Sequence, residues 1–312
     1  MAHSLLVVGS IALDTVRTPH GEAPDVLGGS ATYFSVAASF LAPVRLVGVV
    51  GADFPDEFRR VLESRRIDTA GLEVVSAGKT FRWVGSYEGA MNEAKTEDVQ
   101  LNVFGDFKPV IPPQFRDTRL VFLANGSPIT QAAVLEQVAR PDLVVADTMN
   151  LWIETQRDAL LALLRRVDGL VLNDGEARML TGEHNLVAAA RKVLGLGPAF
   201  VIIKKGEHGA ILAHRDGCQT DGPTTRWVSS LPAYPSLEVR DPTGAGDSFA
   251  GGMMGYLAHE GCYDFRRLVR AMAYGTVMAS FAIEDFSLRR FERLTIDEID
   301  LRLRDYHEML AF

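Results

Sequence analysis

A strand, a turn of small residues and a helix are predicted to follow one another around the run Asp241–Gly252, which reads Asp-Pro-Thr-Gly-Ala-Gly-Asp-Ser-Phe-Ala-Gly-Gly. The preceding segment, Leu237–Arg240, indicates the end of a strand, and the proline in the run stops regular pairing. Its small residues predict a turn with open backbone amides. Apolar residues recur at four-residue spacing from Phe249 to Leu257, which predicts a helix from about Asp247 onward.

The predicted helix start has the two parts that phosphoryl transfer to an alcohol requires. Unpaired amides at a helix start, together with the helix dipole, attract anions such as phosphate. The Asp247 carboxylate beside them can accept a proton from an attacking hydroxyl. An aspartate at a helix start is also a common cap, and small-residue turns occur in many folds. A second glycine-rich segment upstream, Gly28-Gly29-Ser30, favours the catalytic interpretation.

The run Asp241–Gly252 resembles the C-terminal signature of the ribokinase-like (PfkB) carbohydrate and nucleoside kinases, and further family features occur in order along the chain. The resemblance implies an α/β fold with a mostly parallel central sheet, helices on both faces and a small β-sheet lid. It implies one kinase domain over residues 1–312, with lid segments at about 14–27 and 72–107. The implied activity is ATP-dependent phosphorylation of a hydroxyl on a sugar, polyol or nucleoside.

The resemblance also implies roles for the residues of the signature. Asp247 is the expected general base. At Asp241 and Thr243, family members often hold a monovalent cation through backbone and side-chain oxygens, so K⁺ is a candidate cofactor there. The expected anion hole, which stabilises charge on the phosphoryl group, consists of the amides of Gly244, Ala245 and Gly246.

The residues that bind the acceptor substrate, which we call the acceptor side of the site, are expected near the N-terminus. Leu5–Gly9 is a short apolar run that predicts a buried strand, and Asp14 follows it. A loop aspartate is usually a turn or cap residue, but the family places here an aspartate that binds substrate hydroxyls. A carboxylate suits a polyol because it can accept from two adjacent hydroxyls. Gly28 and Gly29 permit close approach of the backbone to a ligand and precede a helix predicted over Ala31–Leu41.

Tyr33 departs from the family pattern, in which many members carry an asparagine four residues after the second glycine. A phenol brings bulk, a stacking face and one hydroxyl instead of an amide. Either Tyr33 only packs, or it contacts an acceptor that is not a plain ribose-like furanose. Both interpretations stay open on the sequence.

Residues 72–107 differ in pattern from the rest of the chain. Thr80–Tyr87 alternates, with its aromatic residues on one face, which predicts a strand with one covered face. Val99–Phe104 is the predicted partner strand. Such a sheet resembles the lid that these kinases close over the substrate, and it can also supply the interface of a homodimer. Asn92, on the connecting segment, is a further candidate for substrate binding.

From Leu120 onward, strands alternate with helices. Parallel strands with helical crossovers place ligands beyond the carboxyl ends of the strands. Polar residues follow several strands there, and capping explains most single cases: Asn125, Asp147, Asn150 and Asn173. The predicted elements are strands Leu120–Ala124, Leu143–Ala146, Leu170–Leu172 and Phe200–Lys204, an antiparallel edge strand Ala210–His214, and helices Gln131–Ala139, Glu154–Arg166, Phe265–Phe281 and Thr295–Leu310.

The nucleotide side is expected to include Asn173-Asp-Gly-Glu176, which matches the family's Asn-x-x-Glu motif. The motif implies that Asn173 and Glu176 help to place Mg²⁺, with its waters, and the phosphates of ATP. Mg²⁺ keeps several waters and needs only one or two carboxylates nearby. A capping box at a helix start explains the same residues, and both interpretations can hold. The resemblance adds three residues that approach the phosphates and ribose of the nucleotide: Lys205, Gly206 and Gly209.

Composition limits the partners and the compartment. The net charge is −8 and the chain has no basic tract, which argues against a nucleic-acid or anionic-membrane surface. No basic-then-apolar leader and no apolar run of membrane-spanning length occur. Cys218 and Cys262 lack metal-ligand spacing and are too few for a disulfide framework. We therefore expect a cytoplasmic protein with a small-molecule substrate.

Two other functional classes compete with a kinase. A non-catalytic ligand-binding or regulatory protein can use the same scaffold, because fold alone does not fix function. The intact Asp247 and glycine turn argue against it, since a binding protein could lose either. An oxidoreductase is disfavoured because Gly9-Ser10-Ile11 lacks the glycine spacing of a dinucleotide site. The acceptor stays open among a nucleoside, an inositol-like ring and a modified sugar.

Overall fold

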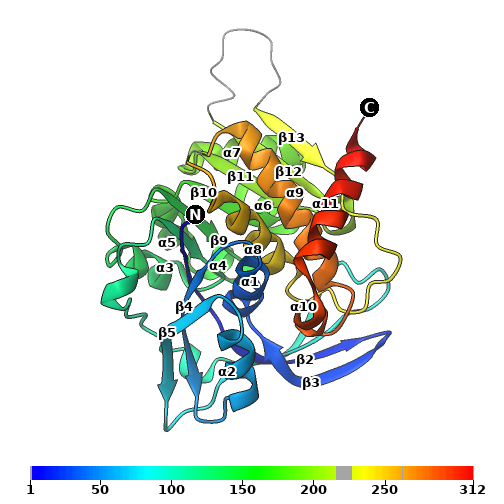
Figure 1. Ribbon diagram of the computed structural model, residues 1–312. Helices are drawn as coiled ribbons and strands as arrows, with labels where there is room; N and C mark the ends of the chain where they lie inside the picture. The colour runs from blue at the N-terminus through cyan, green and yellow to red at the C-terminus, as the bar shows by residue number, and fades with distance from the viewer. Residues whose placement is uncertain (1, 216–226, 262, 312) are drawn as a thin grey trace.

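The computed structural model of the chain describes residues 2–215, 227–261 and 263–311 (Figure 1). Within them lie a nine-stranded sheet and a separate four-stranded sheet. The two cysteines, Cys218 and Cys262, lie outside the described residues, so the prediction about them stays a prediction.

The large sheet has the strand order β13-β12-β11-β10-β9-β8-β1-β4-β5. From β11 to β5 all neighbours are parallel, whereas β12 and β13 add on in antiparallel orientation. A mostly parallel central sheet is therefore confirmed. Its strands are β1 (Leu5–Val8), β4 (Val44–Gly51), β5 (Ile67–Val75), β8 (Leu120–Leu123), β9 (Leu143–Asp147), β10 (Gly169–Asn173), β11 (Phe200–Lys204), β12 (Ala210–His214) and β13 (Val228–Leu231).

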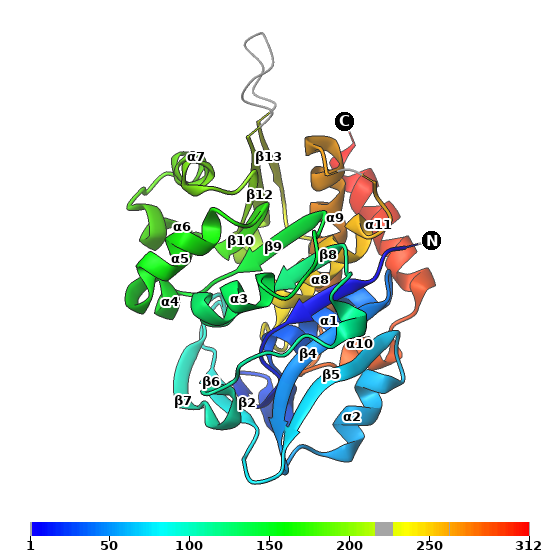
Figure 2. The same ribbon diagram turned by 90° about the vertical axis from the view of Figure 1, so that its left-hand side faces the viewer.

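Helices cover both faces of this sheet, as Figure 2 shows from the side. Alternate residues of β1 point to opposite faces: Leu5 and Val7 enter one hydrophobic core, and Leu6 and Val8 the other. The first layer contains α1 (Ser30–Ser39), α2 (Asp56–Glu63), α8 (Ala245–Leu257), α9 (Phe265–Ala282), α10 (Arg289–Arg293) and α11 (Ile296–Leu310). The second contains α3 (Pro128–Leu135), α4 (Asn150–Thr155), α5 (Arg157–Leu164), α6 (Asp174–Thr181) and α7 (Leu186–Leu196).

The predicted lid is present as the four-stranded sheet, with the order β3-β2-β6-β7. Its strands are β2 (Ala12–Thr18), β3 (Gly21–Gly28), β6 (Phe81–Ser86) and β7 (Lys95–Gln100). Asp14 therefore lies within a strand, not in a loop. The predicted partner strand is present, because β7 pairs with β6 and Trp83 lies opposite Val99. Its predicted bounds, Val99–Phe104, are wrong, because β7 ends at Gln100 and residues 102–104 form a 3₁₀ turn. The Phe104 ring stacks on Phe81, with centroids 5.4 Å apart, which turns this segment inward.

Three other predicted elements differ from the structure. Residues 237–240 form no strand: Leu237 is fully exposed, and Arg240 N donates to Ile283 O at the end of α9, at 2.8 Å, instead of to a neighbouring strand. The strand Ala210–His214 is antiparallel as predicted, but β13 covers its outer side, so it is not the edge. The helix predicted over Glu154–Arg166 is two helices, α4 and α5, which meet at Gln156.

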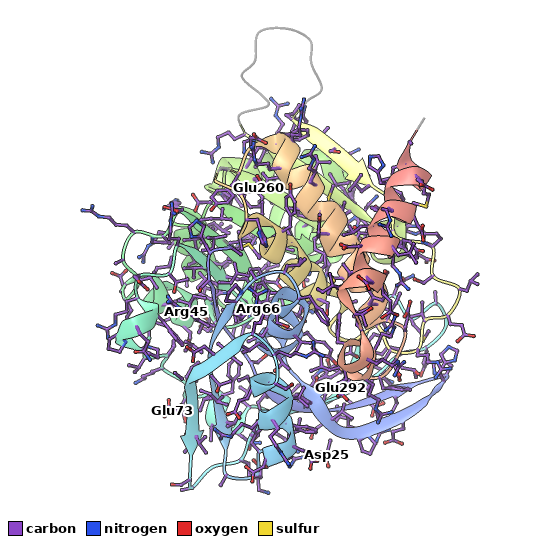
Figure 3. The ribbon with its side chains drawn as sticks, in the orientation of Figure 1. Asp25, Arg45, Arg66, Glu73, Glu260 and Glu292 are labelled. Carbon is purple, nitrogen blue, oxygen red and sulfur yellow. The ribbon has the colours of Figure 1, made fainter. Side chains whose placement is uncertain are left out.

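The surface carries charges of both signs. In Figure 3, Arg45 and Arg66 lie among Glu73, Glu260 and Glu292 on the face that is drawn. In the part of the chain that the structure describes, no helix has both the length and the apolar character needed to cross a membrane.

Candidate active site

Three neighbouring parallel strands of the large sheet carry polar residues at their carboxyl ends, which lie on the same side of the sheet. β9 ends at Asp147, β10 at Asn173 and β11 at Lys204. The strand register pairs Val171 with Asp147 and Asn173 with Lys204. The carboxyl ends of parallel strands are where α/β folds bind ligands. The carboxyl ends of β9, β10 and β11 are therefore the first part of the candidate site.

The turn before α8 forms the second part. Gly244 is the N-cap of α8 with φ of +72°, a left-handed conformation that favours glycine. A β-carbon at this position would overlap the ring of Tyr33, so glycine is required on two grounds. The amide of Ala245 donates to Pro242 O at 3.2 Å. For the amides of Gly244 and Gly246, the described residues show no acceptor, which leaves both free to bind an anion.

Lys204 is a site residue that the sequence analysis did not single out. A β-carbon on Gly246 would lie 2.7 Å from Lys204 Nζ, so the ammonium group lies against the turn. Burial acts to lower the pKa of Lys204, but Asp147, Glu176 and Asp247 outweigh it and raise the pKa above its ordinary value. The signal in the sequence was a charged residue at the end of an otherwise apolar strand.

The carboxylates around Lys204 have raised pKa values. Burial, followed by repulsion from Asp147, raises the pKa of Asp247 to about 7, with Lys204 acting in the opposite direction. The same two causes raise the pKa of Glu176 to about 7. The pKa of Asp147 is also raised by burial, although Lys204 and a hydrogen bond from Thr148 N at 2.8 Å oppose this. A carboxyl group with a pKa near neutrality is suited to take up a proton during a reaction.

Asn173 and Glu176 form the capping box that the sequence offered as one interpretation. Asn173 Oδ1 accepts from Glu176 N at 2.8 Å, and Glu176 Oε2 accepts from Asn173 N at 2.7 Å. Each side chain keeps one further oxygen or amide free of these bonds. The capping interpretation is confirmed, and the role in placing Mg²⁺ stays a prediction.

Asp14 forms the acceptor side. It lies in β2, opposite Val26 of β3, and is 4% exposed. A β-carbon on Gly28 would overlap its carboxylate, so Gly28 makes room for Asp14. Burial raises the pKa of Asp14 to about 7, while a hydrogen bond from the Gly29 amide acts in the opposite direction. Repulsion from Asp241 and Asp247 adds to the rise, which indicates that the acceptor side and the α8 turn are electrostatically coupled.

Tyr33 packs under the turn. The side chain is 1% exposed, and its ring lies against Gly244. Of the described residues, none provides a hydrogen-bond partner for its buried hydroxyl. These contacts support the packing interpretation of Tyr33.

Asp241 connects the turn to the lid. Its two carboxylate oxygens accept from Thr243 N at 2.9 Å and from Ser287 N at 3.0 Å. The Ser287 hydroxyl donates to Leu27 O in β3 at 2.6 Å, and the Thr243 hydroxyl donates to Tyr87, just after β6, at 3.2 Å. We call this set of hydrogen bonds the Asp241 clasp. Because both carboxylate oxygens are engaged in it, the monovalent-cation role of Asp241 and Thr243 stays a prediction.

The lid also reaches the turn that follows β11. Asn92 Nδ2 donates to Glu207 Oε1 at 2.8 Å, and Glu207 lies in the 3₁₀ turn of residues 206–208. The predicted residue Asn92 is thus placed beside Gly206, on the side expected to bind the nucleotide. Lys205 N donates to Gly209 O at 2.7 Å and closes this turn. The ligand contacts of these residues stay predictions.

Two other asparagines at strand ends have structural partners. Asn125 Oδ1 accepts from the indole of Trp152 at 3.0 Å, and Asn150 Oδ1 accepts from Leu151 N at 3.0 Å. Such bonds are the local roles that capping and turn geometry predict for asparagine.

The donor set at the strand ends fits Mg²⁺ with part of its water shell. Over residues 2–215, 227–261 and 263–311, no three histidine, cysteine, aspartate or glutamate side chains make a metal cage. Mg²⁺ does not require one, because it is commonly bound through one or two carboxylates, water and substrate phosphates. Asp147 and Glu176 supply such carboxylates.

Comparisons with known proteins agree with this geometry. Residues 2–292 match the family model described as pfkB family carbohydrate kinase. The chain is 31% identical to the cytidine kinase of Thermococcus kodakarensis over 255 residues, which cover 80% of this chain and 87% of that protein. The structure resembles the nucleoside kinase of Burkholderia thailandensis in complex with inosine, with a TM-score of 0.79, 19% identity, and coverage of 96% and 97%. A putative ribokinase II from E. coli in complex with ATP and Mg²⁺ gives a TM-score of 0.76, 18% identity, and coverage of 97% and 99%.

Proposed function

The chain belongs to the pfkB family of carbohydrate kinases, and from this we propose that it transfers the γ-phosphoryl group of ATP to a hydroxyl group of a nucleoside. It is a phosphotransferase with an alcohol group as acceptor, like the curated relatives it matches. The proposal concerns the nucleotide, the acceptor and the residues that carry the reaction.

Asp247 is the general base of the proposed reaction. It takes the proton of the acceptor hydroxyl as the oxygen attacks the γ-phosphorus. The position of Asp247 in the first turn of α8, beside the free amides of Gly244 and Gly246, supports this role. Those amides stabilise the charge on the transferred phosphoryl group. Its pKa of about 7 lets Asp247 accept a proton near neutral pH.

ATP enters with Mg²⁺ as the second substrate. Glu176 and Asp147 hold the ion, partly through water, and the ion neutralises charge on the phosphates. Asn173 helps to place it. Lys205, Gly206 and Gly209 border the phosphates and ribose of the nucleotide. The family relationship and the solved neighbour with ATP and Mg²⁺ support this assignment.

A nucleoside is the acceptor we favour. Asp14 accepts from two adjacent hydroxyl groups, as the 2′ and 3′ positions of a ribose provide. Burial of Tyr33 under Gly244 removes the argument against a furanose that its side chain raised. A cytidine kinase among the relatives and a nucleoside kinase with inosine among the solved structures point to the same class. The single observation that carries the proposal is the position of Asp247 in the first turn of α8, beside the free amides of Gly244 and Gly246.

Two finer features belong to the proposal. K⁺ binds beside Asp241 and Thr243 through backbone oxygens, and the family resemblance supports this site. A comparison of turnover in K⁺ and in tetramethylammonium tests the K⁺ site. A homodimer forms through the lid, and light scattering of the purified protein tests that. For the dimer, the exposed strand β7 supplies an unpaired edge.

The test is ADP release from ATP and Mg²⁺ across cytidine, inosine, adenosine, ribose, fructose and myo-inositol. We expect turnover with at least one nucleoside and a much lower kcat/KM for the free sugars. Asp247→Asn is expected to reduce kcat by about 10²-fold or more, since general-base catalysis contributes 10²–10⁴-fold.

Different results overturn different parts of the proposal. Turnover with only a sugar or inositol refutes the nucleoside acceptor and retains the kinase. Wild-type turnover by Asp247→Asn removes the general-base role. A correctly folded protein that binds a nucleoside and ATP but releases no ADP supports a ligand-binding protein on this scaffold.

A further inference from the structure

Lys204 is a cationic side chain at the site for which the expected chemistry provides no role. Its ammonium group lies against Gly246, next to the free amides of the α8 turn and near Asp247. The chain carries a net charge of −8, so positive charge at this point has to come from particular groups. Lys204 is such a group.

The ammonium group is not held in a contact ion pair. Asp147, Glu176 and Asp247 act on it electrostatically, yet within the described ranges no carboxylate oxygen lies close enough to Lys204 Nζ to count as a salt bridge or hydrogen bond. Lys204 is half-buried, so part of the residue is exposed to solvent. Its three N–H donors are therefore available to a ligand.

The neighbouring lysine does not have the same position. Successive residues of an extended strand point to opposite sides. Lys204 is the last residue of β11, whereas Lys205 begins the 3₁₀ turn and closes it through its backbone amide. The ammonium group of Lys204 lies against Gly246 in the α8 turn.

We infer that Lys204 is a catalytic residue that binds the transferred γ-phosphoryl group through its ammonium group, together with the Gly244 and Gly246 amides. The inference rests on the proposed kinase function. In the reaction, the bond between the γ-phosphorus and the bridging oxygen breaks, and its electron pair leaves on the β-phosphate. The acceptor oxygen forms the new bond, and its proton goes to Asp247. Lys204 stays protonated throughout and stabilises charge on the moving group.

Charge is the reason for a lysine here. The phosphoryl group has to approach three carboxylates, and each of them repels it. An ammonium group against the turn offsets this repulsion and donates charge-assisted hydrogen bonds, which are stronger than neutral ones. In a loose transition state, the charge on the phosphoryl oxygens is the main target of catalysis.

The competing explanation is a structural counterion. In that case Lys204 only balances Asp147, Glu176 and Asp247, and its removal lowers stability without affecting triphosphate binding in particular. The two explanations differ in what happens to ligands that have or lack the terminal phosphates.

The experiment compares Lys204→Met and Lys204→Arg with the wild type, and uses Lys192→Met as the matched control. Lys192 is exposed on α7, and among the described residues it bonds Thr181 O and Glu183, so its variant removes one positive charge outside the proposed site. Binding of β,γ-imido-ATP with Mg²⁺ and of AMP is measured by calorimetry. Turnover is measured with the best acceptor of the panel, and folding by thermal unfolding.

For Lys204→Met we expect about 10–100-fold weaker binding of β,γ-imido-ATP, with AMP affinity unchanged. We expect kcat to fall by about 10²–10³-fold, with little change in the acceptor KM. Lys204→Arg should recover part of both losses, and Lys192→Met should match the wild type.

Equal weakening of β,γ-imido-ATP and AMP, or kcat within threefold of the wild type, overturns the inference in favour of the counterion. If Lys204→Met does not fold, Lys204→Arg and Lys204→Gln carry the same comparison. The binding measurements need no acceptor, so they remain decisive if the nucleoside proposal fails. A wild type that binds β,γ-imido-ATP no better than AMP refutes the inference as well.

Discussion

Asp14 combines a proposed role in binding the acceptor with a cost in stability. The proposed interaction with two hydroxyl groups needs an ionised carboxylate, yet burial favours the neutral acid and raises the pKa from 3.8 to about 7. The folded protein therefore binds this proton more tightly than the unfolded chain does. Stability from this group is complete below pH 3.8 and is lost as the pH rises to about 7. The ionised site is thus obtained at the expense of stability.

From this we predict that Asp14→Asn stabilises the protein and inactivates it. At pH 8 the free energy of unfolding should rise by ~1–3 kcal/mol, with a much smaller rise at pH 4. The KM for the acceptor should increase strongly, because an amide cannot accept from two hydroxyl groups as a carboxylate does. Urea unfolding at both pH values and acceptor kinetics provide the measurements. A stability difference that is the same at both pH values contradicts the raised pKa.

Tyr33 provides a second prediction at this scale. Its ring supports Gly244, whereas its buried hydroxyl has no partner among the residues that the structure describes. Tyr33→Phe should therefore keep kcat/KM within about threefold and leave stability equal or higher, since an unpaired buried hydroxyl is costly. Tyr33→Ala should lose ~3–5 kcal/mol of stability and most activity. A large loss of activity in Tyr33→Phe alone shows that the hydroxyl contacts a ligand.

Sequence reasoning succeeded for residues fixed by a local pattern and missed those fixed by contacts between segments. The expected positions of Asp247 and Gly244 are confirmed because a helix start is encoded in consecutive residues. Lys204 was missed as a site residue because its contact with Gly246 joins positions far apart in the chain. Tyr33 stayed ambiguous for the same reason, since only the fold brings its ring under Gly244.

Among the elements, the start of α6 serves two purposes. Asn173 caps the helix and closes a capping box with Glu176, the residue proposed to hold Mg²⁺. Capping fixes the place of the Glu176 carboxylate without using its whole coordinating capacity. The same local structure therefore stabilises the helix and holds a carboxylate whose pKa is raised by Asp147 and lowered by Lys204.

The two purposes can be separated by substitution. Asn173→Ser keeps a capping side chain and should cost no more than ~0.5 kcal/mol, whereas Asn173→Ala should cost about 1 kcal/mol. Both should raise the Mg²⁺ concentration for half-maximal activity, because both remove the amide proposed to help place the ion. Thermal unfolding and Mg²⁺ titrations give the two readouts. If Asn173→Ser has an unchanged Mg²⁺ requirement, Asn173 acts only as a cap.

Elements buried on both faces were the easiest to predict. The central strands of the large sheet are short apolar runs, so β11 was found with its exact ends and β1, β8, β9 and β10 to within a few residues. The lid strands lie partly in solvent and their pattern is weaker. The partner strand of β6 was predicted too far along the chain, because Phe104 stacks on Phe81 instead of continuing the ladder beyond Gln100. The strand predicted at Leu237–Arg240 is absent because Leu237 is fully exposed and the Arg240 amide bonds Ile283 O instead of a neighbouring strand.

On the scale of the whole molecule, the Asp241 clasp holds together parts that the chain brings from three regions. It joins the α8 turn to Ser287 after α9, and through Ser287 and Thr243 to the lid near β3 and β6. The carboxylate is fully buried, so its loss leaves two amides without acceptors in the interior.

We therefore predict that Asp241→Ala lowers the free energy of unfolding by ~2–4 kcal/mol and also lowers kcat. Ser287→Ala removes only the bond to Leu27 and should cost about 1 kcal/mol. Limited proteolysis should cut the lid of Asp241→Ala faster than that of Ser287→Ala. If both variants match the wild type in proteolysis, the clasp does not control the lid.

Asp14 and the α8 turn lie far apart along the chain, and this separation has a consequence for how acceptor preference can change during evolution. The groups proposed to recognise the acceptor come from the N-terminal third, and those proposed to handle the phosphoryl group come from the C-terminal half. A gene for such a protein can change its acceptor by altering one stretch while the other is kept intact. Chimeras that exchange residues 12–28 and 81–100 with those of a related kinase should carry the donor's acceptor preference with them.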